Sequence, residues 1–267
     1  MPTRRRHPRS LRQDIAASVD LPPSLVPSIA RVFDAMESLG SSPRAIVSLL
    51  QRHAPPHPRR PLRVLDLACG KGDLAITLAR RFAWRVLAID ACPDFITHAQ
   101  ARAARLGVDH LCDFRAAEIT SALRPGRGTL AHHTPFDLAL MIGLWPTDRA
   151  APLLSRLVRP RGLYLIDDAF AIHENAAERL NTPTLDLALA AIRARGDDVL
   201  HAAHTPLPSV RASNARILAH LARNARALAR QRPPLRPALA EFLDRQRHAS
   251  RALERDLRPA LVLARRA

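Results

Sequence analysis

The hydrophobic positions of the chain form short continuous runs that are separated by stretches with helical spacing. The first run, 64–67, breaks at two glycines, and helical spacing follows from Leu74 to Arg81. This pattern predicts a strand, a tight turn and a helix. Similar runs predict four more strands and two helices, at 85–90, 111–116, 136–142 and 163–166 and at 93–106 and 151–158. Strands that alternate with helices predict an α/β domain.

Helical spacing prevails on both sides of this central part. Ile29, Val32, Phe33 and Met36 share one face of a helix predicted from residue 27 to 40. A second helix is predicted to begin at Pro43, because proline is favoured in a first helical turn. Beyond the fifth strand, the pattern predicts a helix, a sixth strand, two long amphipathic helices and a last strand, at 184–195, 199–204, 209–230, 238–257 and 259–264.

The glycine turn after the first strand is the first candidate ligand site. Gly70 and Gly72 permit backbone angles that side chains disfavour, and they let a ligand approach the main chain. Open α/β sheets bind ligands at the carboxyl ends of their strands. Asp66, inside the strand just before the turn, would repel a pyrophosphate and attract an ammonium group. The turn is therefore expected to hold a nucleoside ligand with a cationic tail.

A second acid, Asp90, ends the second predicted strand, 24 residues after Asp66. An acid at about this separation from a glycine turn commonly accepts hydrogen bonds from ribose hydroxyls. Asp90 could instead only cap the helix that begins near Pro93, and the two roles are compatible. We expect ribose binding.

Four further segments follow one another in a characteristic order. Residues 65–72 fit a D-x-x-x-G-x-G signature, and 114–119 fit a third strand with Glu118 at its end. Residues 136–143 fit a fourth strand, and 159–167 a Pro-x-Gly turn into a fifth. Together with Asp90, these segments resemble the class I, Rossmann-like methyltransferases that depend on S-adenosylmethionine. The resemblance covers about residues 60 to 170, and Glu118 departs from the aspartate that is usual there.

The resemblance implies a Rossmann-like, seven-stranded, mostly parallel sheet with an antiparallel last strand. The chain would then comprise a disordered basic tail at 1–13, N-terminal helices at 14–60 that pack on the core, and a methyltransferase domain at 61–267. A helical insertion at about 209–257, before the last strand, would form a lid or a homodimer surface.

The resemblance also assigns the cofactor, S-adenosyl-L-methionine, to particular residues. Asp66 would anchor the methionyl ammonium, Asp90 would bind the ribose, and Glu118 and Ile119 would flank the adenine. Met141 would pack on the nucleoside. The complete expected set of cofactor-binding residues is Asp66, Ala68, Cys69, Gly70, Gly72, Asp90, Ala91, Glu118, Ile119 and Met141.

Candidates for catalysis lie after the fifth strand. Asp167 and Asp168 must point to opposite sides of a strand, and Asp168 is the preferred candidate for the pocket. Asp168 or His173 could remove a proton from the acceptor. Trp145, after the fourth strand, could line the substrate pocket or fill a gap in the helix packing.

Composition constrains the partners. The net charge is +17, and Lys71 is the only lysine among 41 basic residues, which suggests an acidic partner such as nucleic acid. Aromatic residues, which stack on bases, make up only 4%. The charge is therefore only a modest hint, and we expect a small-molecule acceptor because the lid-like insertions of the resembled family usually enclose one. An RNA methyltransferase or RNA-binding protein is the alternative, and a nicotinamide-dependent oxidoreductase, which Asp66 disfavours, comes third.

Three cysteines fit neither a disulfide framework nor a zinc pattern, and no metal site is expected. No apolar run approaches the length of a membrane span, and the basic N-terminus lacks the apolar core of a signal peptide. The chain is expected to be cytoplasmic.

Overall fold

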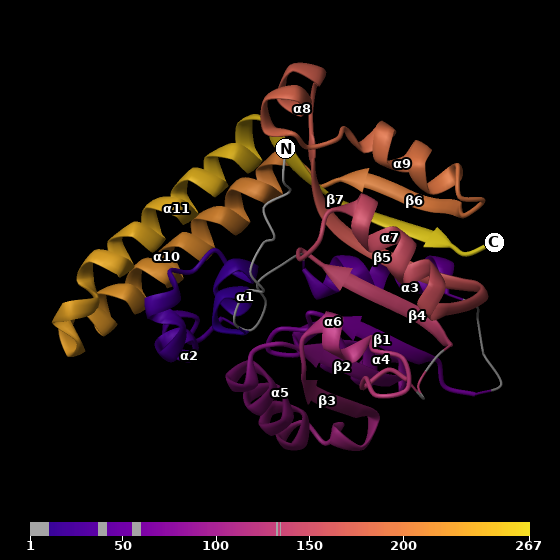
Figure 1. Ribbon diagram of the computed structural model, residues 1–267, viewed down its shortest axis with the longest axis horizontal. Helices are drawn as coiled ribbons and strands as arrows, with labels where there is room; N and C mark the ends of the chain where they lie inside the picture. The colour runs from indigo at the N-terminus through magenta and orange to yellow at the C-terminus, as the bar shows by residue number, and fades with distance from the viewer. Residues whose placement is uncertain (1–10, 37–41, 55–59, 132, 134) are drawn as a thin grey trace, which may run out of the picture.

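The computed structural model describes residues 11–36, 42–54, 60–131, 133 and 135–267. Seven strands form one sheet in the order β3-β2-β1-β4-β5-β7-β6 (Figure 1). Strand β7 pairs antiparallel with β5 and β6, and the other pairs are parallel. The bounds are β1 Arg63–Leu67, β2 Arg85–Asp90, β3 Cys112–Ala116, β4 Phe136–Ile142, β5 Val158–Ala171, β6 Asp198–His204 and β7 Leu257–Arg265. The predicted fold class is confirmed.

Helices cover both faces of the sheet, which explains why the central strands are apolar on both sides. One buried cluster joins the sheet to α3 (Pro43–His53), α4 (Asp73–Phe82) and α5 (Pro93–Arg105). A second cluster joins the opposite face to α6 (Ile119–Ala122), α7 (Thr147–Leu157) and α9 (Leu185–Arg193). The central strands β1 and β4 therefore lie between two helical layers.

A third apolar cluster lies beside the sheet and joins segments that are far apart in the sequence. It combines α1 (Leu11–Ser18), the 3-10 helix η1 (Pro23–Ser28) and α2 (Ile29–Val32) with α10 (Leu207–Gln231) and α11 (Arg236–Arg255). The last two helices form a long hairpin through η3 (Pro233–Leu235) (Figure 1). We call residues 11–36 together with α10 and α11 the helical cover. Its centre is Phe33, which meets Phe95 of α5 and Phe242 of α11 edge-on, both at 6.0 Å between ring centroids.

The structure departs from the sequence predictions in several elements. Of the helix predicted from residue 27 to 40, only Ile29–Val32 is α-helical as α2, residues 27 and 28 end the 3-10 helix η1, and residues 37–40 lie outside the described residues. Strand β5 continues to Ala171, five residues beyond its predicted end, because β7 supplies a partner along its whole length. Helices α1, α6 and α8 (Glu174–Leu180) were not predicted.

The predicted tail, residues 1–13, lies mostly outside the described residues, and its last three residues begin α1. None of the described helices combines the length and the apolar character that a membrane crossing requires.

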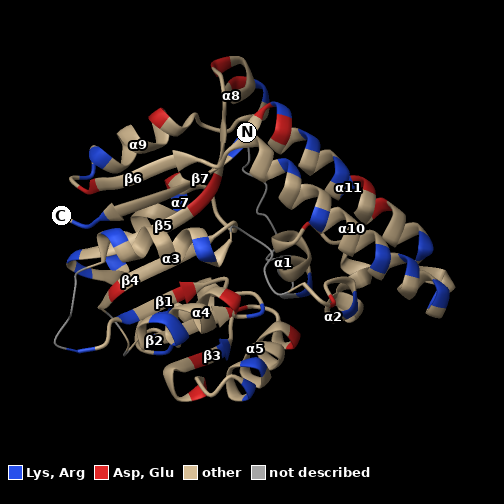
Figure 2. Cartoon of the chain, turned by 180° about the vertical axis from the view of Figure 1, so that it is seen from behind, with Lys and Arg blue, Asp and Glu red and all other residues tan. Residues whose placement is uncertain are grey.

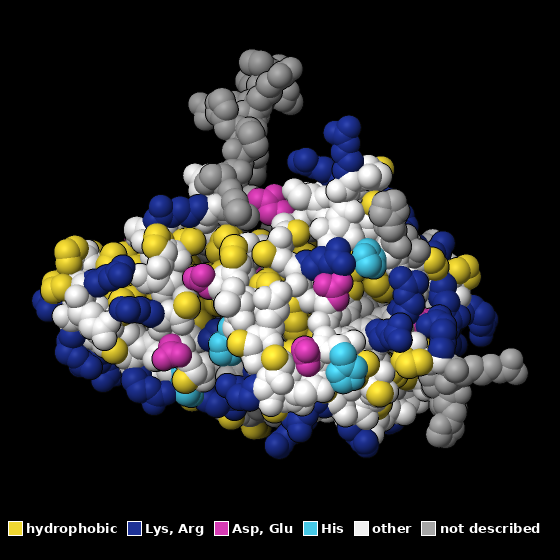
Figure 3. Space-filling model, turned by 90° about the horizontal axis from the view of Figure 1, so that it is seen from below, with side chains coloured by type: hydrophobic (Ala, Val, Ile, Leu, Met, Phe, Trp, Pro, Cys, Tyr) yellow, Lys and Arg dark blue, Asp and Glu magenta, His cyan; other side chains and the backbone are white. Residues whose placement is uncertain are grey.

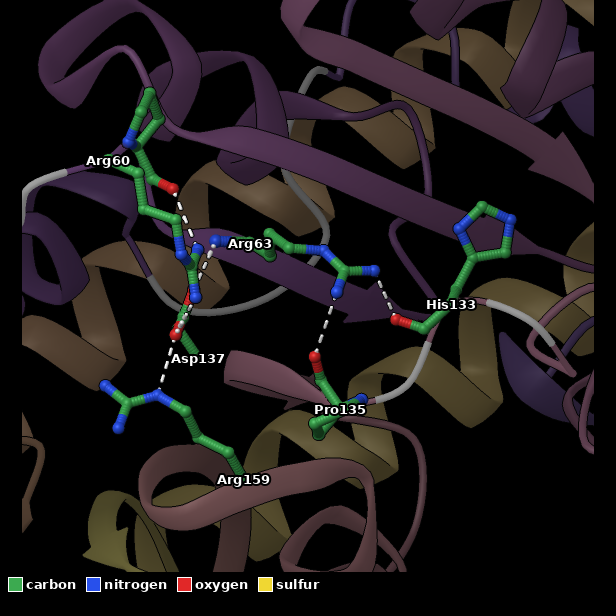
Figure 4. A network of polar contacts seen from close by, with 7 residues as sticks. Arg60, Arg63, His133, Pro135, Asp137 and Arg159 are labelled. Atoms are coloured by element: carbon green, nitrogen blue, oxygen red, sulfur yellow. Dashed lines mark hydrogen bonds and ion pairs between the residues drawn. The ribbon is translucent and has the colours of Figure 1, made fainter.

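A buried acid fastens the amino-terminal side of the sheet. Asp137 of β4 accepts hydrogen bonds from the guanidinium groups of Arg60 and Arg159 and from the backbone N–H of Arg63, at 2.7 to 3.0 Å (Figure 4). Burial raises the pKa of Asp137, but these hydrogen bonds outweigh burial and leave its pKa below the usual value. The segment before β1 is thereby tied to β4 and β5.

Candidate functional site

The turn after β1 joins that strand to the carboxyl end of β2. The N–H groups of Ala68 and Cys69 both donate to the carbonyl oxygen of Ile89, at 2.8 and 3.0 Å. Ala68, Gly70 and Gly72 all adopt left-handed backbone angles, with φ of 65°, 54° and 74°. Alanine in this region carries a cost of about 1 kcal/mol, so the turn holds a strained residue beside its glycines.

The two glycines of the turn serve different purposes. A Cβ at Gly72 would lie 2.7 Å from the ring of Phe114 and 2.8 Å from the Cβ of Ala99, so close packing requires glycine. A Cβ at Gly70 would meet nothing within 4 Å. Gly70 lines a cavity, and its missing side chain leaves the backbone open to a ligand.

Asp66 is the most unusual polar residue of the site. Its side chain is 1% exposed, and its Oδ2 has no hydrogen-bond partner among the described residues. Burial, and secondarily the charge of Asp90, raise the pKa of Asp66 to about 7. A buried carboxylate is costly unless a cation or hydrogen-bond donor meets it. Asp66 therefore fits a ligand that carries a positive group.

Asp90 braces the turn from β2. Its Oδ2 accepts from the N–H of Gly70 at 2.8 Å, and its Oδ1 accepts from the N–H of Cys92 at 2.9 Å. Burial raises the pKa of Asp90, although these two hydrogen bonds oppose the shift. Each carboxylate oxygen retains a lone pair, so Asp90 can still accept hydrogen bonds from ligand hydroxyls.

Two cavities meet at this turn. The larger, of about 510 Å³, is lined by Asp66, Ala68, Cys69 and Gly70 and extends under the helical cover. The smaller, of about 320 Å³, is lined by residues that follow β2 and β3. Ala68 and Asp90 line both. Cavities of roughly 300 to 1,000 Å³ suit small ligands, and this pair suits an elongated molecule that spans Asp90.

Most of the predicted cofactor-binding residues line these cavities. The larger contains Asp66, Ala68, Cys69, Gly70 and Asp90, and the smaller contains Asp90, Ala91, Glu118 and Ile119. Two predicted residues line neither. Gly72 packs against Phe114 and Ala99, as described above. Met141, a residue of β4, is fully buried in the second apolar cluster. Ile142, Gly143 and Leu144, which follow Met141, line the larger cavity.

The two predicted catalytic residues make local contacts away from the cavities. Asp168 accepts from the N–H and the hydroxyl of Thr147 and from the N–H of Ala169, at 2.7 to 2.9 Å. These bonds fix the start of α7, and burial nevertheless raises the pKa of Asp168. His173 is exposed, and its Nδ1 accepts from the N–H of Ala176 at the start of α8. Neither residue lines a described cavity.

A contact between the turn and the helical cover could not be seen in the sequence. Lys71, in the turn, is 4% exposed, and its Nζ donates to the carbonyl oxygen of Phe33 at 2.6 Å. It also lies 6.0 Å from the centre of the Phe95 ring. This bond links the turn to the cover. The position of Lys71 between two glycines was visible in the sequence, but its partner, 38 residues upstream, was not.

Trp145 closes the far end of the smaller cavity. The guanidinium of Arg149 stacks over its ring at 3.5 Å from the centroid, and both residues line that cavity beside Glu118 and Ile119. Trp145 also packs against the second apolar cluster, beneath α7, as the other interpretation of this residue expected.

The residues of the site fit S-adenosylmethionine. The unpartnered Asp66 suits an ammonium group, the open backbone at Gly70 suits close approach, and Asp90 offers acceptors between the two cavities.

Comparisons with known proteins agree with this fit. A family profile described as a methyltransferase domain matches residues 64–162. A comparison with curated protein sequences found no match. A methyltransferase from Geobacter sulfurreducens, solved with S-adenosyl-L-homocysteine, has a similar structure, with a TM-score of 0.70 and 20% identity over 88% of this chain and 96% of that one.

Two other similar structures show how widely the fold is used. A putative sarcosine dimethylglycine methyltransferase from Galdieria sulphuraria has a TM-score of 0.66 and 14% identity, over 91% of this chain and 98% of that one. The cyclopropane synthase MmaA2 from Mycobacterium tuberculosis has a TM-score of 0.66 and 13% identity, over 96% and 98%. Likeness at such identities establishes the fold and leaves the acceptor open.

The family profile and the fold confirm the resemblance and the cofactor that it implied. Residues 64–162 match a methyltransferase domain, and the chain has the fold of the class I, Rossmann-like methyltransferases that depend on S-adenosylmethionine.

Proposed function

We propose that this methyltransferase acts on a small molecule that is enclosed between the glycine turn and the helical cover. The observation that carries this proposal is the shared lining of the larger cavity. Asp66 and Gly70 line it on one side, and Asn214 and Leu253 of the α10–α11 hairpin line it on the other. A cofactor held at the turn would therefore present its methyl group to a space that the cover closes.

The cofactor would span both cavities. Its ammonium would lie near Oδ2 of Asp66, and its ribose hydroxyls would bind Asp90. Its adenine would lie in the smaller cavity beside Glu118 and Ile119, with Trp145 at the end. Support comes from the cavity lining and from the missing partner of Asp66.

The acceptor would occupy the part of the larger cavity under the cover. Phe33, Met36, Ile46, Ile217 and Leu253 give this part an apolar wall. Such walls exclude water and orient a bound molecule by shape.

Positioning is the main contribution that this chain must make. The bound cofactor supplies an activated methyl group, and holding a nucleophile in line with it can account for about 7–11 kcal/mol of the barrier. Asp168 and His173 remain predictions as bases, and their capping contacts favour a structural role.

The experiment that tests this proposal separates acceptors by size. The purified enzyme is incubated with methyl-labelled S-adenosylmethionine and a cell extract divided into small molecules, RNA and protein. We expect label in the small-molecule fraction. Leu253→Trp, which fills the cover end of the cavity, should abolish that label while S-adenosylhomocysteine still binds. Label in RNA or protein, or none among small molecules, would refute the proposal.

RNA is the second candidate acceptor, because exposed arginines recur along α10 and α11, where blue bands mark the two helices (Figure 2). Arg216, Arg223 and Arg230 recur every seven residues on α10. Seen from below, dark blue side chains border the end of the molecule that the hairpin forms (Figure 3). A steep decrease of RNA binding with salt would favour this candidate.

A further inference from the structure

Among the described residues of the cover that line the larger cavity, Asn214 is the buried polar one. Asn214 of α10 is 8% exposed and lines the cavity. Its Nδ2 donates to the backbone oxygen of Ser250 at 3.1 Å and to Oε1 of Glu254 at 2.9 Å, both on α11.

These two bonds fix the orientation of the amide. Only the nitrogen of an asparagine side chain can donate, and both neighbours can only accept in this geometry. Nδ2 must therefore face α11, and Oδ1 is the polar atom that remains for the cavity. None of the described residues donates a hydrogen bond to Oδ1.

The second observation is the charge of the lining. The chain has 41 basic residues, of which only Lys71 is lysine, yet none of the arginines in the described part of the chain lines the larger cavity. Lys71 itself points to the carbonyl of Phe33. Among the described residues of the cover that line this cavity, only Asp20 is charged, and its side chain is 53% exposed and paired with Arg245 at 3.5 Å. A carboxylate or phosphate placed there would be buried without a partner, which costs several kcal/mol.

From these observations we infer that Asn214 selects an uncharged or amine acceptor, an apolar molecule whose nucleophilic nitrogen or oxygen carries a hydrogen. This inference rests on the proposed function. Oδ1 accepts the N–H or O–H, and the apolar wall holds the rest of the molecule. Anionic acceptors, and acceptors without a donor, are disfavoured.

The reaction balances with the groups that are present. The nucleophilic nitrogen or oxygen forms a bond to the methyl carbon, and the carbon–sulfur bond breaks with its electron pair left on sulfur. The proton of the N–H or O–H leaves to water at the rim of the cavity, near the exposed Asp20. An amide oxygen is too weak a base to take this proton, so Asn214 binds and orients the acceptor.

The test uses ring probes of one shape and different polarity. Saturation-transfer NMR measures their dissociation constants on the enzyme loaded with S-adenosylhomocysteine. Cyclohexanol and cyclohexylamine carry a donor, cyclohexanone only accepts, and cyclohexanecarboxylate is anionic. We expect the two donors to bind about 3- to 10-fold more tightly than the other two, as one hydrogen bond would give.

Two variants separate this contact from the stability of the hairpin. Asn214→Leu removes Oδ1 and should abolish the preference. Glu254→Ala removes one bond to Nδ2, leaves Oδ1 in place and should retain the preference. The wild-type comparison stands by itself should Asn214→Leu fold poorly.

The outcomes separate this inference from the proposed function. Equal or tighter binding of cyclohexanone or the carboxylate, no detectable binding of either donor, or a preference that survives in Asn214→Leu would overturn the inference. S-adenosylhomocysteine is titrated on the same samples. Failure of the wild type to bind it would instead overturn the proposed cofactor placement.

Discussion

The buried acid in β1 should make the ligand-free protein less stable as the pH rises. Asp66 is 1% exposed, and burial, followed by the charge of Asp90, raises its pKa from 3.8 to about 7. Below pH 3.8 the group is neutral in both native and unfolded chains and has no effect. Between pH 3.8 and about 7 the unfolded chain releases a proton that the native chain retains, so the free energy of unfolding decreases. Above about pH 7 the loss is complete.

The magnitude follows from the proton linkage. Within this window, the free energy of unfolding decreases by about 1.4 kcal/mol for each pH unit. The total decrease is up to about 4 kcal/mol, of which about 2–3 kcal/mol falls between pH 5 and pH 8. The variant Asp66→Asn lacks this titration. The amide has its own burial cost of about 1–3 kcal/mol, but that cost is the same at both pH values and cancels in the comparison.

The assay is urea unfolding of wild type and Asp66→Asn at pH 5 and pH 8, without cofactor. We expect the variant to gain about 2–3 kcal/mol relative to wild type on going from pH 5 to pH 8. Asp94→Asn, an exposed acid in the first turn of α5, serves as a control and should show no such gain. An equal difference at both pH values would refute the assignment of Asp66 as a strained acid.

The same acid should connect cofactor binding to protons. An ammonium group beside Asp66 stabilises the carboxylate, so binding at pH 6 should release close to one proton. Calorimetry of S-adenosylhomocysteine in two buffers with different ionisation enthalpies measures this number. Asp66→Asn should release none and should bind more weakly. Equal proton release by the two proteins would show that the ammonium lies elsewhere.

Three further predictions concern the frame of the site. Asp137→Leu should lower the free energy of unfolding by about 2 kcal/mol at pH 7, since three donors lose their acceptor. Urea unfolding at pH 3 should show a smaller loss, because the unfolded chain then gains a proton on this residue and the lowered pKa of native Asp137 contributes less stability. Gly72→Ala should destabilise the protein by about 2–3 kcal/mol, because its Cβ would overlap with Phe114. The control Gly107→Ala, at a glycine with a similar φ and open space around it, should cost about 1 kcal/mol. Thermal unfolding measures both changes. Asp168→Asn should lower the melting temperature yet leave the KM for S-adenosylmethionine unchanged, and a loss of kcat without a loss of stability would restore Asp168 as a base.

The sequence predicted the part of the site that is local in the chain. Asp66, Gly70 and Asp90 lie at strand ends, and the parallel sheet brings consecutive strand ends together whatever the detail of the packing. The apolar runs fixed those strands because both faces of the sheet are covered. The glycine turn and the two acids could therefore be placed without knowledge of distant contacts.

The predictions that depended on tertiary contacts were less successful. The contact of Met141 with the nucleoside stays a prediction, and the alternation of β4 places its side chain in the buried layer, away from both cavities. The extension of β5 to Ala171 depends on pairing with β7, nearly a hundred residues away. The bond from Lys71 to Phe33 and the orientation of Asn214 likewise depend on the packing of the cover, which no local pattern specifies.

The placement of charge in the proposed complex separates binding from catalysis. The ammonium of the cofactor is charged before and after methyl transfer, so a carboxylate beside it holds substrate, transition state and product alike. Such uniform binding improves affinity without slowing the chemical step. The sulfonium loses its charge during the reaction, and an acid beside it would stabilise the starting state more than the transition state. In this enzyme Asp66 and Asp90 lie in β1 and β2 beside the turn, whereas Phe33, Met36 and Leu253 line the cover end. The acids therefore lie beside the ammonium, whose charge does not change, and the apolar cover lies beside the sulfonium, whose charge is lost. With this arrangement, tight cofactor binding does not slow methyl transfer.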